Sequence, residues 1–324
     1  MDSRPEEANS TDATTTTASF PFNDTSADLI LRSSDRVHFH VHKPLLSLAS
    51  PVFRDMFGIG QAPQILPGIP VVQMSEDSDV LHKLLVWCDP RSVTLPGQFT
   101  FLDISRVLSL TDKFMMEGVT SRVAMLLLPK HVDMLPAHVY ALAHRGRGSW
   151  GDGLMRAAAW QSLKSDFPHH TRVFDDIPAK ALMRLYEYRI DCIIATQSLI
   201  SNIRWIPRER PWQHHYHNTE ECSCISLECN GGRSWVAKWF VSYLTRAADA
   251  LKEKPCREAI FLDLDNRGIP VGGQQVAPTS YDGGTCSDCF DLSDGATRTA
   301  FSLFQQEFAN EIDRLTKEVE LIID

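Results

Sequence analysis

Residues 28–57 have the sequence DLILRSSDRVHFHVHKPLLSLASPVFRDMF, and this stretch decides the fold of the N-terminal part of the chain. The continuous apolar run from Leu29 to Leu31 is typical of a buried strand. Apolar side chains then alternate with histidines from Val37 to Val41, and this period of two indicates a half-buried strand. Short polar residues between the two runs supply the chemistry of a tight turn. The stretch therefore predicts two short strands joined by a turn.

Two short helices are expected after the second strand, and single residues mark their limits. Pro44 suits a first helical position, where a missing N–H costs little. Ser50 followed by Pro51 indicates an N-cap and the first turn of a second helix. Phe53 and Phe57 lie on one face of that helix by i, i+4 spacing. The glycine after Phe57 predicts the end of the helix.

This arrangement resembles the BTB (POZ) domain. In that family an aspartate opens the first strand, a His-Lys pair follows the second, and a Leu-x-x-x-Ser-Pro-x-Phe helix pair ends in Met-Phe. The matching residues here are Asp28, His42, Lys43, Leu46, Ser50, Pro51, Phe53, Met56 and Phe57. The resemblance implies an α+β domain over residues 25–130, with a small sheet flanked by helices. The alternative is an unrelated small α/β hairpin with two helices.

The chain of 324 residues is too long for one ordinary core, so further domains are expected. Residues 1–24 are polar and aperiodic, which predicts a disordered tail. Residues 131–204 show helical spacing and are similar to the helical region that follows the BTB domain in fungal proteins of the basidiomycete type, in the place of the BACK region of other BTB adaptors. Residues 205–324 are expected to form a cysteine-containing, mainly helical module.

A long helix is predicted near the C-terminus because large apolar residues recur there in steps of three or four. They are Phe301, Phe304, Phe308, Ile312, Leu315, Val319 and Ile322. One face of this helix is fully apolar and must pack against something. We expect it to pack on a helix at 235–251 and on the middle region; the alternative is a self-pairing coiled coil.

Composition narrows the function classes. The chain is 43% hydrophobic with a net charge of −9, and no Lys/Arg block stands out, which argues against a nucleic-acid or anionic-membrane partner. No apolar run approaches the length of a membrane span, and the N-terminus has no secretory signal pattern. We therefore expect an intracellular protein, cytoplasmic or nuclear, whose eight cysteines are thiols or metal ligands and not disulfides.

Two close cysteine pairs, Cys222/Cys224 and Cys286/Cys289, are the best candidates for a chemical role. Four thiolates would close a tetrahedral structural zinc site and join the starts of two helices. The first pair is Cys-x-Cys, tighter than the usual spacing, so one member has alternatives. These are Cys229, Cys256, His214, His215 and His217. The other interpretation is a set of reduced, partly buried thiols.

The sequence does not support the presence of a recognised enzyme motif. Residues 146–151 match G-x-G-x-x-G, but they follow a predicted helix and not a strand, so they predict a helix–helix loop and no dinucleotide site. No nucleophile elbow, H-E-x-x-H or phosphate-binding G-x-x-x-x-G-K motif is present.

The BTB resemblance implies a non-enzymatic protein that dimerises and binds protein partners, notably the cullin scaffolds of ubiquitin ligases. In cullin-binding members the loop after the Met-Phe helix carries a hydrophobic-x-Glu motif. Here residues 58–64 contain no acid. Phe57 and Ile59, at the edge of that loop, are the expected partner-binding residues. The alternatives are a homo-oligomeric or transcription-linked scaffold without cullin binding, and a metal-dependent enzyme in the C-terminal region.

Overall fold

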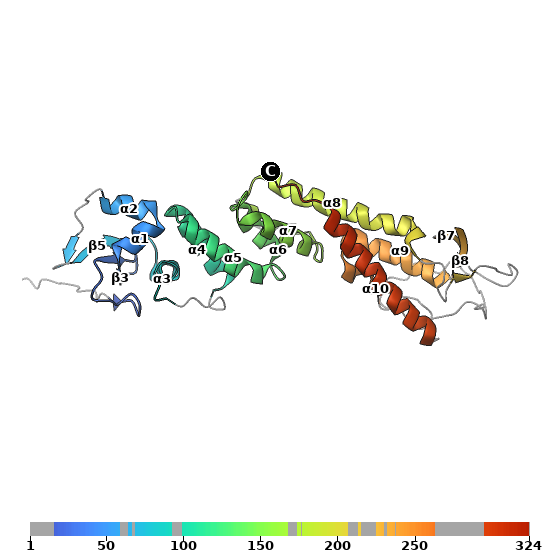
Figure 1. Ribbon diagram of the computed structural model, residues 1–324, viewed down its shortest axis with the longest axis horizontal. Coiled ribbons are helices and arrows are strands. Elements are labelled where there is room, and N and C mark those ends of the chain that lie inside the picture. Colours follow the sequence, from blue (N-terminus) through green and yellow to red (C-terminus); the bar gives the residue numbers. More distant parts are fainter. Residues whose placement is uncertain are drawn as a thin grey trace, which may run out of the picture. The chain divides into compact units, whose positions relative to one another are not determined.

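The computed structural model divides the chain into two compact units, Met1–His131 and Val132–Asp324 (Figure 1). It describes residues 16–58, 64–66, 69–92, 99–167, 174–175, 177–206, 213–214, 225–229, 232–236, 238–262 and 295–323. The first unit ends one residue after the expected domain. The second unit joins the two regions that the sequence suggested as separate, 131–204 and 205–324, and each unit is described by itself below.

A five-stranded sheet forms one part of the first unit, with the strand order β1-β3-β2-β5-β4. The strands are β1 (Thr16–Thr17), β2 (Leu29–Arg32), β3 (Val37–Val41), β4 (Gln64–Leu66) and β5 (Ile69–Gln73). β2 pairs antiparallel with β3, so that Leu31 lies opposite Phe39, and β2 pairs parallel with β5. Leu29, Leu31 and Phe39 are fully buried, which confirms the two predicted strands.

Helices cover the rest of this unit. They are α1 (Lys43–Ala49), α2 (Pro51–Gly58), α3 (Ser78–Leu85), α4 (Phe101–Lys113), α5 (Glu117–Leu127) and the short 3-10 helix η2 (Leu128–His131). Asp77 caps α3 by accepting from the N–H of Val80, and Thr100 forms a reciprocal capping box with Asp103 at the start of α4. The apolar faces of α3, α4 and α5 are buried, so the α+β fold expected for this region is confirmed.

The segment 16–24, expected to belong to a disordered tail, is ordered. Thr16 and Thr17 pair in parallel with β3. Phe22 is 1% exposed and its ring lies edge-on to His82, with centroids 5.4 Å apart. The expectation was wrong for these residues because their order comes from tertiary contacts, which a local pattern does not reveal. Residues 1–15 lie outside the described part of the chain.

The second unit is mainly helical (Figure 1). Its helices are α6 (Pro136–His144), α7 (Gly151–Ser162), α8 (Ala179–Ser201), α9 (Lys238–Glu253) and α10 (Gly295–Glu318), with the short 3-10 helices η4 (Ile203–Trp205) and η5 (Arg257–Ile260). Residues 146–151 turn the chain between α6 and α7, as predicted for a helix–helix loop. A three-stranded sheet, which the sequence did not suggest, contains β6 (Gln213–His214), β7 (Ile225–Cys229) and β8 (Gly232–Val236) in the order β6-β8-β7.

The apolar face of α10 is buried within this unit. Phe301 lies edge-on to Tyr243 of α9 with centroids 4.9 Å apart, and Phe304 contacts Phe240. α8 packs against both α9 and α10, and Leu199 shares their core. The predicted packing of the long helix is therefore confirmed for its phenylalanines and Ile312, and their burial removes the seam that a coiled coil needs. The helix ends at Glu318, so Val319 and Ile322 lie beyond it, and Ile322 is 51% exposed.

Candidate functional site

The residues of the motif in 28–57 hold the first unit together through backbone contacts. Asp28, directly before β2, accepts a hydrogen bond from the N–H of Lys43 at 2.8 Å. It therefore satisfies a free donor at the start of α1, a task that His42, the cap residue itself, does not perform with its side chain. Leu46 of the same helix is buried. An aspartate 15 positions earlier in the chain thus fixes where the first helix begins.

Ser50 and Pro51 start α2 as the sequence predicts. The N–H of Phe53 donates to the Ser50 hydroxyl at 3.1 Å, and the hydroxyl donates onward to the carbonyl oxygen of Phe114 at 2.5 Å. Phe53 is fully buried and stacks on Phe114 with ring centroids 4.8 Å apart. The start of α2 is therefore attached to the end of α4 by one polar and one aromatic contact.

Phe57 continues this aromatic row toward the surface. Its ring stacks on Phe53 with centroids 6.0 Å apart, and both Met56 and Phe57 are half-buried. At the other end of the row the ammonium of Lys113 lies 5.2 Å from the Phe114 ring centroid. Ile59 lies outside the described residues. Of the two expected partner-binding side chains, the structure describes Phe57 and fixes it at the end of a rigid helix.

His42 belongs to a charged cluster that attaches the 20–24 segment to the rest of the unit. Its Nε2 lies 3.4 Å from the Asp24 carboxylate, and Arg91 bridges Asp24 and Asp89. Hydrogen bonds from Ser26 and then from Arg91 lower the pKa of Asp24, and the same guanidinium lowers the pKa of Asp89. The cluster keeps both carboxylates ionised at neutral pH and serves structure, because every partner in it is already satisfied.

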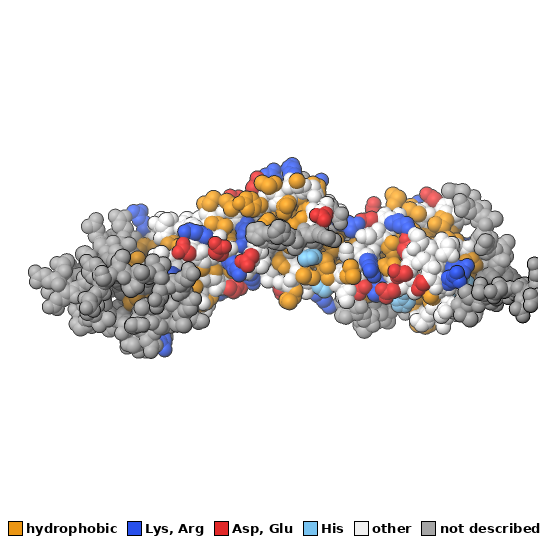
Figure 2. Space-filling view, turned by 180° about the vertical axis from the view of Figure 1, so that it is seen from behind, with side chains coloured by type: hydrophobic (Ala, Val, Ile, Leu, Met, Phe, Trp, Pro, Cys, Tyr) orange, Lys and Arg blue, Asp and Glu red, His pale blue; other side chains and the backbone are white. Residues whose placement is uncertain are grey.

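Exposed apolar side chains mark where the first unit can meet a partner. Leu48 on α1 is 87% exposed. Other exposed large apolar residues of this unit are Phe20, Leu102, Met115, Met125 and Leu126. On the face seen in Figure 2, Lys and Arg side chains alternate with Asp and Glu, and hydrophobic side chains reach the surface between them. Among the described residues, no helix has the length and apolar character required to cross a bilayer.

The predicted zinc ligands Cys222, Cys224, Cys286 and Cys289 lie outside the described residues, so zinc stays a prediction. Of the possible substitutes, Cys256 is buried as a free thiol at the start of η5, and burial raises its pKa. Within the described part of the chain, no group of three or more His, Cys, Asp or Glu side chains is arranged to hold a metal ion.

The sequence-based reasoning missed two features that bear on function. One is the exposure of Leu48, which helical spacing alone could have suggested, because Leu46 and Leu48 cannot both face the core of a short helix. The other is a pocket in the second unit, which is lined by the consecutive helices α7 and α8 and by the distant α10 and is described below.

Comparison with known proteins agrees with this geometry. The family model described as BTB/POZ domain matches residues 21–130. The match begins within the ordered 16–24 segment and ends at the last residues of the first unit. A search of curated proteins finds no match for the chain.

Proposed function

We propose that this chain, whose residues 21–130 form a BTB/POZ domain, acts as a substrate adaptor of a cullin-type ubiquitin ligase. A BTB domain is a protein-interaction domain and not a catalytic one. The proposed adaptor role is supported by the presence of two compact units, which can bind two different proteins. One unit would bind the ligase scaffold and the other would present a substrate.

The observation that carries the proposal is the position of Phe57. It is half-buried at the last turn of α2, and stacking on Phe53 holds its ring in place. A fixed aromatic side chain contributes a large contact area at low entropic cost when a partner binds. Ile59 stands two positions after Phe57 in the sequence, and we expect its side chain to add apolar surface to the contact with the partner. The absence of an acid in residues 58–64 makes an apolar contact, and not a charged one, the expected basis of recognition.

A pull-down of the whole chain with a cullin N-terminal region tests this role. The wild type should be captured and Ile59→Asp should not, because a charge buried in an apolar interface without a partner costs several kcal/mol, roughly 2–5. Leu48→Asp is the matched control, since it places the same charge on an exposed leucine of α1. If neither the wild type nor Ile59→Asp is captured, the ligase role is removed, and if both are captured, the contact does not involve Ile59.

One observation favours a second function, a homo-oligomeric scaffold. Leu48 exposes most of its apolar surface on α1, and contact with a second copy would remove that surface from water. The mass of the protein in solution, measured by light scattering, separates the two functions. A dimer that Leu48→Asp converts to a monomer would support the scaffold, whether or not a cullin binds.

We also propose a structural zinc ion held by Cys222, Cys224, Cys286 and Cys289. Support comes from their neighbours, because β7 begins directly after Cys224 and α10 begins shortly after Cys289. A four-cysteine site leaves no open position for a substrate, so it would brace the unit and would not make it a metal-dependent enzyme. Elemental analysis should find one zinc per chain in the wild type and none in Cys289→Ser, whereas Cys88→Ser should retain it.

A further inference from the structure

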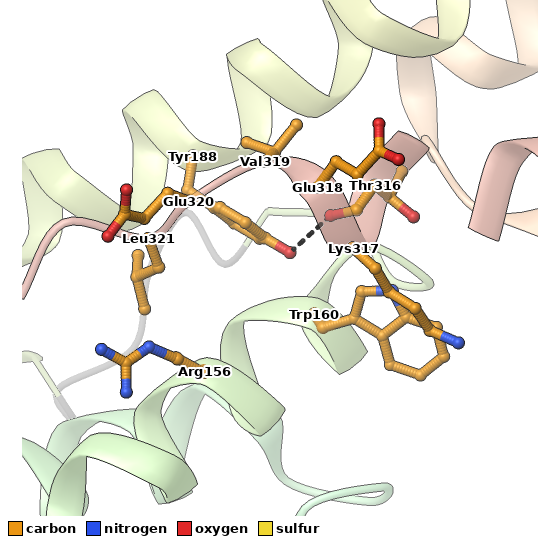
Figure 3. Close-up of a pocket in the computed structure, with 9 residues that line it drawn as sticks. All are labelled: Arg156, Trp160, Tyr188, Thr316, Lys317, Glu318, Val319, Glu320 and Leu321. Atoms are coloured by element: carbon orange, nitrogen blue, oxygen red, sulfur yellow. Dashed lines mark hydrogen bonds between the residues drawn. The ribbon is translucent and has the colours of Figure 1, made fainter. Parts of the chain in front are cut away.

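A pocket of about 450 Å³ lies within the second unit, and no part of the proposed function uses it. Its walls come from α7, from α8, from the end of α10 and from the segment that follows α10. The volume is in the range of small-molecule sites, roughly 300–1,000 Å³. Figure 3 shows the Tyr188 ring entering this space from α8, with Arg156 and Trp160 of α7 on opposite sides of it.

The pocket presents hydrogen-bond donors. Arg156 and Trp160 are four residues apart on α7, so they project from the same face of the helix. Tyr188 is 5% exposed, and its hydroxyl donates to the carbonyl oxygen of Thr316 at 3.5 Å, which is long for such a bond. Burial raises the pKa of Tyr188, so its hydroxyl keeps its proton at neutral pH. A guanidinium, an indole N–H and a phenol therefore offer donors to an acceptor ligand.

The charges of the lining favour an anion. Among the described residues, neither Arg156 nor Lys317 has a carboxylate within ion-pair distance. Of the two acids in the lining, Glu318 is already paired with Arg314 at 2.6 Å, which leaves Glu320. The ammonium groups of Lys164 and Lys317 lie 5.1 Å and 5.5 Å from the Trp160 ring centroid. Lys164 is itself paired with Glu258 at 3.1 Å, so the charges of the lining that remain are the cations of Arg156 and Lys317 and the carboxylate of Glu320.

The rest of the pocket is apolar. The side chain of Leu321 is 3% exposed and lies above Arg156 in Figure 3, and Val319 lines the upper edge. An apolar body placed between Leu321 and the Trp160 ring would lose contact with water on both faces. The pocket therefore combines an apolar wall, an aromatic face and convergent donors, which is the usual design of a small-molecule site.

We infer that this pocket binds a small carboxylic acid with an aromatic or apolar body. The carboxylate accepts hydrogen bonds from the Arg156 guanidinium and from the Tyr188 hydroxyl, which turns its proton from its long bond with Thr316 to the ligand, and the body lies against Trp160 and Leu321. Arg156 is the residue that selects for negative charge, because its planar guanidinium matches the two oxygens of a carboxylate. The site lies wholly within the second unit and does not depend on how the BTB domain is used.

Fluorine NMR of the full chain tests this with three probes that share one body. They are para-fluorophenylacetate, its uncharged amide, and the corresponding arylethylamine, which is a cation. Each is titrated to about 10 mM, since ligands of this size bind in the millimolar range. The indole N–H signal of Trp160, assigned by its loss in Trp160→Phe, reports whether the acid occupies this pocket.

The acid should bind and shift the Trp160 signal, and the amide and amine should bind at least about tenfold more weakly. Arg156→Gln should weaken binding of the acid about tenfold. Arg298→Gln should leave it unchanged, because Arg298 is exposed near the start of α10, roughly 28 Å from Lys317 at the helical rise per residue. No binding of the acid, equal or tighter binding of the amine, or an unchanged affinity in Arg156→Gln would each overturn the inference. The comparison of probes on the wild type decides the matter even if a variant folds poorly.

Discussion

The hydroxyl of Ser50 donates to the carbonyl oxygen of Phe114, 2.5 Å away, across 64 positions of the sequence. Both groups are buried, and the same hydroxyl accepts from the N–H of Phe53. One small polar side chain therefore caps the start of α2 and also provides a hydrogen-bond donor for the carbonyl group of Phe114 at the end of α4. The motif serine is thus a tertiary contact as well as a helix cap.

Replacing Ser50 by alanine should lower the free energy of unfolding of the first unit by about 1–3 kcal/mol, since a buried donor and a buried acceptor both lose their partner. Chemical denaturation followed by circular dichroism measures the change. Ser109→Ala, at an exposed position of α4, is the control and should change stability by less than about 0.5 kcal/mol. Equal effects of the two substitutions would contradict the role given to Ser50.

Replacing each of two glycines of α7 by alanine should change the stability of the second unit in opposite directions. A Cβ at Gly151 would stand 1.9 Å from the carbonyl oxygen of Ala143, so Gly151→Ala must separate α6 from α7 and should cost roughly 1–3 kcal/mol. A Cβ at Gly153 would meet nothing within 4 Å, and Gly153→Ala should stabilise the helix by about 0.5–1 kcal/mol. Thermal unfolding of both variants tests this, and stabilisation by Gly151→Ala would contradict the close approach.

Arg189 of α8 joins the ends of two other helices. It is 6% exposed and donates at 3.0 Å to the carbonyl oxygen of Ser162, the last residue of α7, and also to that of Glu253, which ends α9. A cation at helix C-termini is favourable, and removing it strands buried acceptors. Arg189→Met should therefore destabilise the second unit by about 3 kcal/mol. Arg184→Met, which removes a partly exposed ion pair with Glu187, should cost no more than about 0.5 kcal/mol.

His82 gives the first unit a dependence on pH. Its ring contacts Phe22 and Phe39, and burial lowers its pKa below the ordinary 6.5. The unfolded chain then binds a proton more readily than the folded one, so the contribution to stability is complete above pH 6.5 and is lost as pH falls below that value. Denaturation between pH 8 and about pH 5 should show a smaller loss of stability for His82→Gln than for the wild type. A dependence on His38 remains, because burial lowers its pKa as well.

The sequence predicted the parts of the fold in which local chemistry and tertiary structure agree. Leu29 to Leu31 form a buried strand, Ser50 caps α2, and the apolar face of α10 is covered by α8 and α9. It failed at the 16–24 segment, where Phe22 is ordered by Phe39 and His82 and not by its own neighbours. Contacts between residues distant in the sequence leave no periodic pattern of apolar residues from which they could be predicted.

The candidate sites were harder to predict for the same reason. Arg156 and Trp160 share a helix face, but Tyr188 and Thr316 reach the pocket from helices that are distant in the sequence. Only the packing of α10 against α8 brings them together. Phe57 belongs to a contiguous motif, so its place near the end of α2 could be predicted from the sequence, and its role in partner binding stays a prediction. Motifs reveal sites built on one element, whereas a pocket between elements becomes visible only with the fold.

Titration calorimetry of the whole chain with a cullin N-terminal region tests the central claim most directly, because it gives the affinity and the stoichiometry together. We predict that the wild type binds one cullin region per chain. Ile59→Asp should raise the dissociation constant at least about tenfold, and Leu48→Asp should leave it unchanged. The account is contradicted if the wild type releases no heat of binding, or if Ile59→Asp binds as tightly as the wild type.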